Sequence, residues 1–140
     1  MPFRRQWLLQ DRVLFVQFHD AISADDISTV TKQHETWLAS SDSPHPIHYI
    51  VDLRQVTAYP RHIREIQSSL HTRMRHTDWM LFVTDDFFMK HIGDVFSKLL
   101  KYRFKRYSSV IEAYRFLQEI EEIPNPETWV DNIDDTMPRR

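Results

Sequence analysis

The stretch that most constrains the fold runs from Pro46 to Thr57, with the sequence PIHYIVDLRQVT. β-Branched and aromatic side chains dominate it, and the run is too short for a buried helix. The turn-like segment SDSPHP precedes it and Tyr59-Pro60 follows it, as is typical of the two ends of a strand. Its residues are apolar on both faces, which is typical of a central strand in a parallel sheet. We therefore expect a sheet built around this strand.

The segments on either side predict strands and helices in a regular order. Two strand-like runs, 3–10 and 12–19, are separated by little more than Asp11 and are expected to pair as an antiparallel hairpin. A helix is expected from residue 24 to about Ser40, followed by the strand described above. The remaining segments predict a helix over 61–76, a strand over 79–84, a helix over 87–102, a strand over 103–107 and a helix over 110–120.

This order predicts an α/β fold. The sheet is expected to be single, mixed and mostly parallel, with an N-terminal β-hairpin followed by βα repeats that are joined by right-handed crossovers. A chain of 140 residues fits one domain with one sizeable core. We assign residues 1–123 to this domain. Residues 124–140, which contain prolines and acids without a period, are expected to form a partly ordered C-terminal tail.

Two serines are expected to cap helices. Ser23 precedes the first helix with Asp26 three residues later, and Ser109 precedes the last helix with Glu112 three residues later. A hydroxyl residue followed at that spacing by an acidic residue resembles the capping box, in which each side chain bonds the backbone N–H of the other residue.

Composition excludes several classes of function. The absence of cysteine excludes disulfides, thiolate catalysis and cysteine-based metal sites, and a single glycine, Gly93, cannot supply a glycine-rich phosphate loop. The net charge of -2 gives no overall attraction to nucleic acid. Basic residues between 98 and 115 are interpreted as the charged side of an edge strand. No nucleic-acid partner is therefore expected.

The hydropathy of the chain gives no indication of a membrane-spanning segment. The apolar runs are far shorter than the ~20 residues of a membrane-spanning helix, so no membrane span is expected. The apolar run near the amino terminus, Trp7 to Leu9, is too short for the core of a signal peptide. A cytoplasmic location is therefore the expectation.

A functional surface is expected at one edge of the sheet. In open parallel sheets, ligand-binding groups gather beyond the carboxyl ends of the strands. Arg61 and His62 would stand at the amino terminus of a helix there, where free backbone N–H groups favour an anionic group. The residues of this predicted partner- or anion-binding rim are Thr57, Tyr59, Arg61, His62, Asp85 and Asp86.

Catalytic chemistry has little support in the residues. His19, Asp20 and Asp85 stand at expected strand ends and are a candidate acid-base cluster. Asp85 or Asp86 is more simply explained as the cap of the helix that follows, and no GxSxG elbow is present. We assign no catalytic residue and expect that the chain is not an enzyme.

No metal site or cofactor is expected either. The chain has eight histidines, and the best spacings are His45-x2-His48 and His62-x2-Glu65. Neither spacing supplies three ligands on one element. His48 is interpreted as a histidine whose hydrogen bonds are satisfied inside the sheet.

An apolar pocket is a further candidate. The expected helix over 87–102 has a wide apolar stripe, and an aromatic strand precedes it. Such a stripe usually packs as ordinary core or forms a homodimer face. The candidate pocket residues are Trp79, Phe82, Phe88, Ile92 and Phe96.

The chain resembles the STAS and SpoIIAA-like families, which contain sulfate-transporter domains, anti-sigma-factor antagonists and small stand-alone relatives. The resemblance covers most of residues 5–122. It is carried by Val51-Asp52-Leu53-x-x-Val56-Thr57, which looks like the central strand, and by the segment RFKRYSSVIEAYRFL at 103–117, which looks like the closing strand and helix.

The resemblance implies a non-enzymatic regulatory or protein-interaction module. In the anti-sigma-factor antagonists, a phosphorylatable serine lies in an Asp-Ser-Ser-Gly motif after the central strand. Residues 60–63 occupy this place here and contain no serine, so the phosphoserine switch is not expected, and Thr57 is the nearest hydroxyl. The implied partner is another protein or a second copy of the chain. The alternative, suggested by some relatives, is a binding protein for a small apolar or amphipathic ligand.

Overall fold

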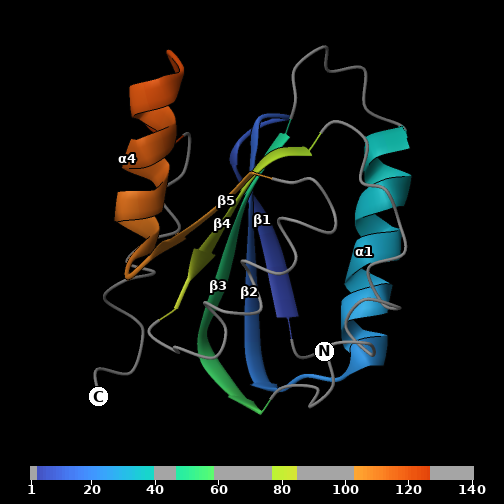
Figure 1. Cartoon of the computed structure of the whole chain (residues 1–140). Helices are drawn as coiled ribbons and strands as arrows, with labels where there is room; N and C mark the ends of the chain where they lie inside the picture. Colours follow the sequence, from blue (N-terminus) through green and yellow to red (C-terminus); the bar gives the residue numbers. More distant parts are fainter. Residues whose placement is uncertain (1–2, 40–46, 59–76, 85–102, 127–140) are drawn as a thin grey trace.

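The fold is taken from a computed structural model, which describes residues 3–39, 47–58, 77–84 and 103–126 (Figure 1). Two strands come first and are followed by a helix; three further strands and a last helix complete the described elements. In chain order these are β1 (Phe3–Leu9), β2 (Val13–Ala21), α1 (Ala24–Ala39), β3 (Ile47–Ala58), β4 (Thr77–Val83), β5 (Arg103–Tyr107) and α4 (Val110–Ile120).

The strands form one mixed sheet in the order β1-β2-β3-β4-β5. β1 and β2 are antiparallel, and β2, β3, β4 and β5 are parallel to one another. The predicted hairpin and the mostly parallel sheet are therefore confirmed. The strand that dominates the sequence, β3, has neighbours on both sides and occupies the centre of the sheet.

An aspartate makes the hairpin turn without glycine. The Arg12 N–H donates to the Leu9 carbonyl over 3.0 Å, and Asp11 between them has φ 61°. Aspartate tolerates this left-handed conformation better than most residues because its short polar side chain can bond locally. This explains how β1 and β2 pair although neither Asn-Gly nor Asp-Gly is present.

The two helices cover opposite faces of the sheet (Figure 1). Alternate residues of β3 divide between the faces: Tyr49 and Val51 pack in the core under α1, whereas Ile50 packs in the core under α4. This is the period-two alternation of a strand. The α4 core contains Leu8, Phe15, Leu81, Val83, Ala113, Tyr114 and Leu117, and the α1 core contains Leu14, Val16, Phe18, Val30, Ile47 and Leu53.

Both predicted caps are present. Ser23 and Asp26 exchange hydrogen bonds, N–H to Oδ2 over 2.9 Å and N–H to Oγ over 3.1 Å. The Ser109 hydroxyl accepts from the Glu112 N–H over 3.2 Å, and the Ser108 hydroxyl donates to the Glu112 carboxylate over 2.9 Å. The sequence therefore placed the amino termini of α1 and α4 correctly.

Some sequence predictions fall outside the described residues, namely the helices over 61–76 and 87–102. The boundary between the domain and its tail stays a prediction. After α4, Ile123 is buried and the Tyr114 hydroxyl donates to the Pro124 carbonyl over 2.8 Å. Within the described part of the chain, the helices are too short or too polar to cross a membrane.

Replacing Ser109 with alanine should destabilise the protein by about 1 kcal/mol, because the Glu112 N–H loses its acceptor at the start of α4. Urea unfolding monitored by circular dichroism measures this change. Ser108→Ala is the matched control, since Ser108 is exposed and bonds only a side chain in the described contacts. Equal losses for the two variants would contradict the capping role of Ser109.

The same two serines make Glu112 sensitive to acid. The hydrogen bond from the Ser108 side chain is the main cause that lowers the pKa of Glu112, and bonds from Ser109 add to it. The folded carboxylate therefore holds its proton less tightly than the unfolded one. This stability is present above about pH 4.5 and is lost as the pH falls through the folded pKa. In an NMR titration, Ser108→Ala should raise the pKa of Glu112; an unchanged value would contradict the assignment.

Candidate functional site

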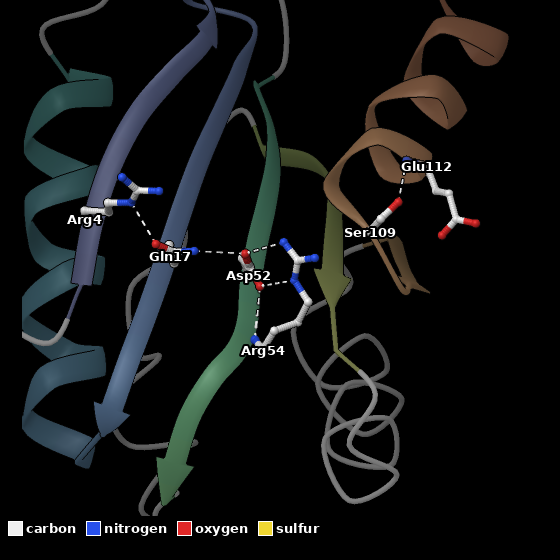
Figure 2. A network of polar contacts seen from close by, with 6 residues as sticks. All are labelled: Arg4, Gln17, Asp52, Arg54, Ser109 and Glu112. Atoms are coloured by element: carbon white, nitrogen blue, oxygen red, sulfur yellow. Dashed lines mark hydrogen bonds and ion pairs between the residues drawn. The ribbon is translucent and has the colours of Figure 1, made fainter. Parts of the chain in front are cut away.

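A row of polar side chains crosses three strands on the face of the sheet that α4 covers (Figure 2). Arg4 of β1 donates through Nε to Gln17 Oε1 over 2.7 Å, and Gln17 of β2 donates through Nε2 to Asp52 Oδ2 over 3.1 Å. Arg54 donates to Asp52 through Nε over 3.0 Å and through Nη2 over 2.9 Å. Because arginine only donates and carboxylate only accepts, the chemistry fixes which way the Gln17 amide points.

The Asp52 carboxylate is fully occupied by donors. Oδ1 accepts from the backbone N–H and from Nε of Arg54, and Oδ2 accepts from Gln17 and from Nη2 of Arg54. Its exposure is 0%, and the Arg54 side chain is 16% exposed. A buried carboxylate is stable only when it is paired and hydrogen-bonded. With four donors on its two oxygens, Asp52 holds the Arg54 guanidinium in place.

A register shift places Arg54 beside Asp52. Gln17 pairs with Asp52, but His19 pairs with Gln55, so β3 has an extra residue relative to β2 at this point. Arg54 falls in this shift. Its N–H donates to Asp52 Oδ1 over 3.0 Å. The bulge thus brings together two residues that are two positions apart, near the middle of β3.

Thr57 is the member of the predicted rim that the described residues contain. It is exposed near the end of β3, three residues beyond Arg54. The other rim residues lie outside the described residues; they are Tyr59, Arg61, His62, Asp85 and Asp86.

The candidate acid-base cluster is present in part. His19 Nδ1 lies 3.1 Å from Asp20 Oδ2, and the Asp20 side chain is 82% exposed. Asp20 has φ 61°, a left-handed conformation that is uncommon for residues other than glycine. This pair lies on the surface at the end of β2, where water screens its charges. Asp85, the third proposed member, lies outside the described residues.

The two described residues of the candidate apolar pocket do not come together. Trp79 packs against the core under α4, where its ring meets Phe116 edge-on at 4.8 Å. Phe82 packs against the core under α1, on the opposite face. They cannot line one pocket, because they are three positions apart on the regular part of β4 and an odd step along a strand leads to the opposite face. Phe88, Ile92 and Phe96 lie outside the described residues.

Sequence reasoning missed a second polar cluster, at the opposite end of the sheet. His48, interpreted as a satisfied histidine, has 0% exposure, and its Nε2 lies 3.2 Å from Glu121 Oε1. Arg12 holds Glu121 Oε2 over 2.8 Å. Burial acts to raise the pKa of Glu121, but the close contacts and the charges of His48 and Arg12 outweigh it and lower that pKa. No sequence pattern indicates this cluster, because its residues are far apart in the chain.

Arg4 and Gln17 were also missed. A sequence signal did exist for the centre of the row, because a charged residue within a buried strand needs a partner, and an arginine two positions later stands on the same face.

Replacing Asp52 with asparagine should destabilise the protein by about 3 kcal/mol, because an NH2 group would then face the donors of Arg54 or Gln17 inside the sheet. Urea unfolding followed by fluorescence measures the change. Asp20→Asn is the matched control and should change stability by less than about 0.5 kcal/mol, since this aspartate is exposed and asparagine also tolerates a positive φ. If Asp52→Asn proved as mild as Asp20→Asn, the buried row would not hold the sheet.

Comparisons with known proteins support a fold. No protein-family model matches the chain, and the search of curated proteins gave no match. Among solved structures, the chain is similar to an uncharacterised protein of the DUF3478 family from Shewanella loihica, which is described as having a SpoIIAA-like fold. The two share 15% identity with a TM-score of 0.62, over 82% of this chain and 93% of the other. The chain therefore has the SpoIIAA-like fold that its sequence predicts.

Proposed function

We propose that the chain is a non-enzymatic regulatory or protein-interaction module that works without a phosphoserine switch. The observation that carries this proposal is the saturated carboxylate of Asp52. A general base needs a free lone pair within reach of the proton that it removes, and the buried acid of the central strand has none. The polar row is a rigid support rather than a reaction centre.

The support ends in a cation at the carboxyl half of the sheet. Both carboxylate oxygens of Asp52 accept hydrogen bonds from the Arg54 guanidinium, and one also accepts from the Arg54 N–H. The guanidinium is therefore fixed in place before any partner binds. A group that is already ordered loses less conformational entropy on binding. The row contains two arginines, Arg4 and Arg54, against one carboxylate. This charge favours an acidic partner surface.

The contact surface extends from Arg54 to the exposed Thr57 at the end of β3. In sequence it continues into the predicted rim residues Tyr59, Arg61 and His62. An acidic segment of a partner protein, or of a second copy of the chain, is the occupant that this chemistry fits.

The test is native mass spectrometry of the protein purified from its own host, which reads subunit number and bound masses together. We expect a homodimer or a complex with a second protein. Thr57→Glu should weaken that complex at least about tenfold, because a carboxylate then faces an acidic partner; like-charge contacts at interfaces cost several kcal/mol. Thr36→Glu is the matched control, since it makes the same change at an exposed position of α1 and should leave binding unchanged.

Two outcomes would overturn the proposal. The first is a monomer without a partner, or a complex that Thr57→Glu and Thr36→Glu affect equally. The second is a reproducible adduct of small mass, which would favour the alternative, a binding protein for an apolar or amphipathic ligand. The separation of Trp79 and Phe82 on two faces of the sheet gives that alternative no support from the described residues.

A further inference from the structure

The cluster at the amino end of the parallel strands brings three potential metal ligands together. His48 comes from the start of β3, Asp78 from the start of β4, and Glu121 from the residue that ends α4. One ligand atom of each residue lies within 4.8 Å of those of the other two. The residues are 30 or more positions apart in the chain, so only the folded sheet assembles them.

A bulge in β4 is the reason that Asp78 reaches this cluster. Ile47 pairs with Thr77 and Tyr49 pairs with Met80, so two steps along β3 correspond to three steps along β4. The extra residue lets Asp78 and Trp79, which are consecutive, both lie opposite His48. The Asp78 carboxylate lies near the imidazole, and the Trp79 N–H donates to His48 Nδ1 over 3.4 Å. A regular strand would turn one of these two residues to the other face.

The imidazole nitrogen that faces Glu121 is in an ion-pair contact whose geometry is poor for a hydrogen bond. His48 Nε2 is fully buried and has no partner of acceptable geometry, although Glu121 Oε1 is 3.2 Å away. A buried polar atom without a hydrogen bond costs free energy. This buried nitrogen, 3.2 Å from Glu121 Oε1, is the atom that coordination of a cation between the three groups would use.

We propose that His48, Asp78 and Glu121 bind a divalent transition-metal ion, with Zn²⁺ as the representative ion. One imidazole and two carboxylates suit such an ion, and three protein ligands leave a coordination position for water. Arg12 holds the second oxygen of Glu121 over 2.8 Å. Contacts of this kind orient a ligating carboxylate from outside the site. The ion would tie the end of α4 to β3 and β4.

Coordination through Nε2 requires that the neutral imidazole carries its proton on Nδ1. Without metal, Nδ1 accepts from the Trp79 N–H, and the proton belongs on Nε2. The Trp79 contact is long at 3.4 Å, close to the limit at which a hydrogen bond is lost. Metal binding therefore exchanges one tautomer for the other and releases this N–H, which gives a signature that a structural role of His48 would not produce.

The experiment titrates the full chain, freed of metal with a chelator, with zinc chloride in a calorimeter. In parallel, ¹⁵N NMR of the imidazoles follows the tautomer of His48, and amide spectra follow Trp79. We expect one tight site, a proton on Nδ1 when zinc is bound, and a shifted Trp79 amide. Asp78→Asn and Glu121→Gln should each weaken zinc binding at least about tenfold, with circular dichroism to verify folding. His48→Gln is not needed, since a fully buried substitution could unfold the chain.

Asp20→Asn is the matched control, since it alters an exposed pair of histidine and aspartate at the other end of the sheet and should leave binding unchanged. The chain has eight histidines, so zinc that binds equally well to Asp78→Asn and Glu121→Gln would show adventitious surface binding and overturn the proposal. An absence of binding, or bound zinc with the proton still on Nε2 of His48, would overturn it as well.

Discussion

A buried polar side chain is stable in a sheet only when its hydrogen-bonding groups have partners, and the backbone can supply them. This happens at two shifts of register. At the shift in β3, the Arg54 N–H is taken by the Asp52 carboxylate, and at the shift in β4, the Trp79 N–H is taken by the His48 imidazole. Each acceptor is a buried polar residue with 0% exposure. The two polar features of the sheet therefore lie at its shifts of register.

These two features share one face of one strand. His48, Ile50 and Asp52 alternate along β3 on the side that α4 covers, and the first and last lie roughly 13 Å apart at the usual rise of a strand. Ile50 lies between them with 0% exposure, in the core with Leu81 and Val83. An apolar layer thus separates a row with an excess of arginine from a cluster rich in carboxylate. Groups of opposite net charge therefore lie at the two ends of one sheet.

Much of the fold could be predicted because its signals are local. The alternation and the β-branched run of β3 depend on the strand itself, and the caps at Ser23 and Ser109 depend on residues three positions away. The hairpin followed from two apolar runs with little between them. The order of the segments predicted a mostly parallel sheet and supported the family resemblance, and the structural similarity to a SpoIIAA-like protein agrees with both.

The polar sites could be predicted only in part because they depend on register. A charged residue such as Asp52 within a buried strand requires a partner of opposite charge. The spacing of two positions indicates Arg54 as that partner, because it stands on the same face. Gln17 meets Asp52 only because β2 and β3 are aligned as they are, 35 residues apart. His48 and Glu121 are further apart still, and no periodicity in the sequence records a bulge in a parallel strand. Trp79 and Phe82 were grouped as neighbours in sequence, whereas alternation separates them.

The bulge in β4 also sets where the length of this chain can vary. Alternation makes most strands intolerant of a one-residue deletion, since everything on one side of the deletion turns over to the wrong face. Between Thr77 and Met80 the opposite holds, because losing one residue would restore the even count against Ile47 and Tyr49 and leave the core residues in phase. Homologous chains can therefore differ by one residue here without refolding the sheet. Those with the shorter strand would keep the fold and have one residue opposite His48, in place of the pair Asp78 and Trp79.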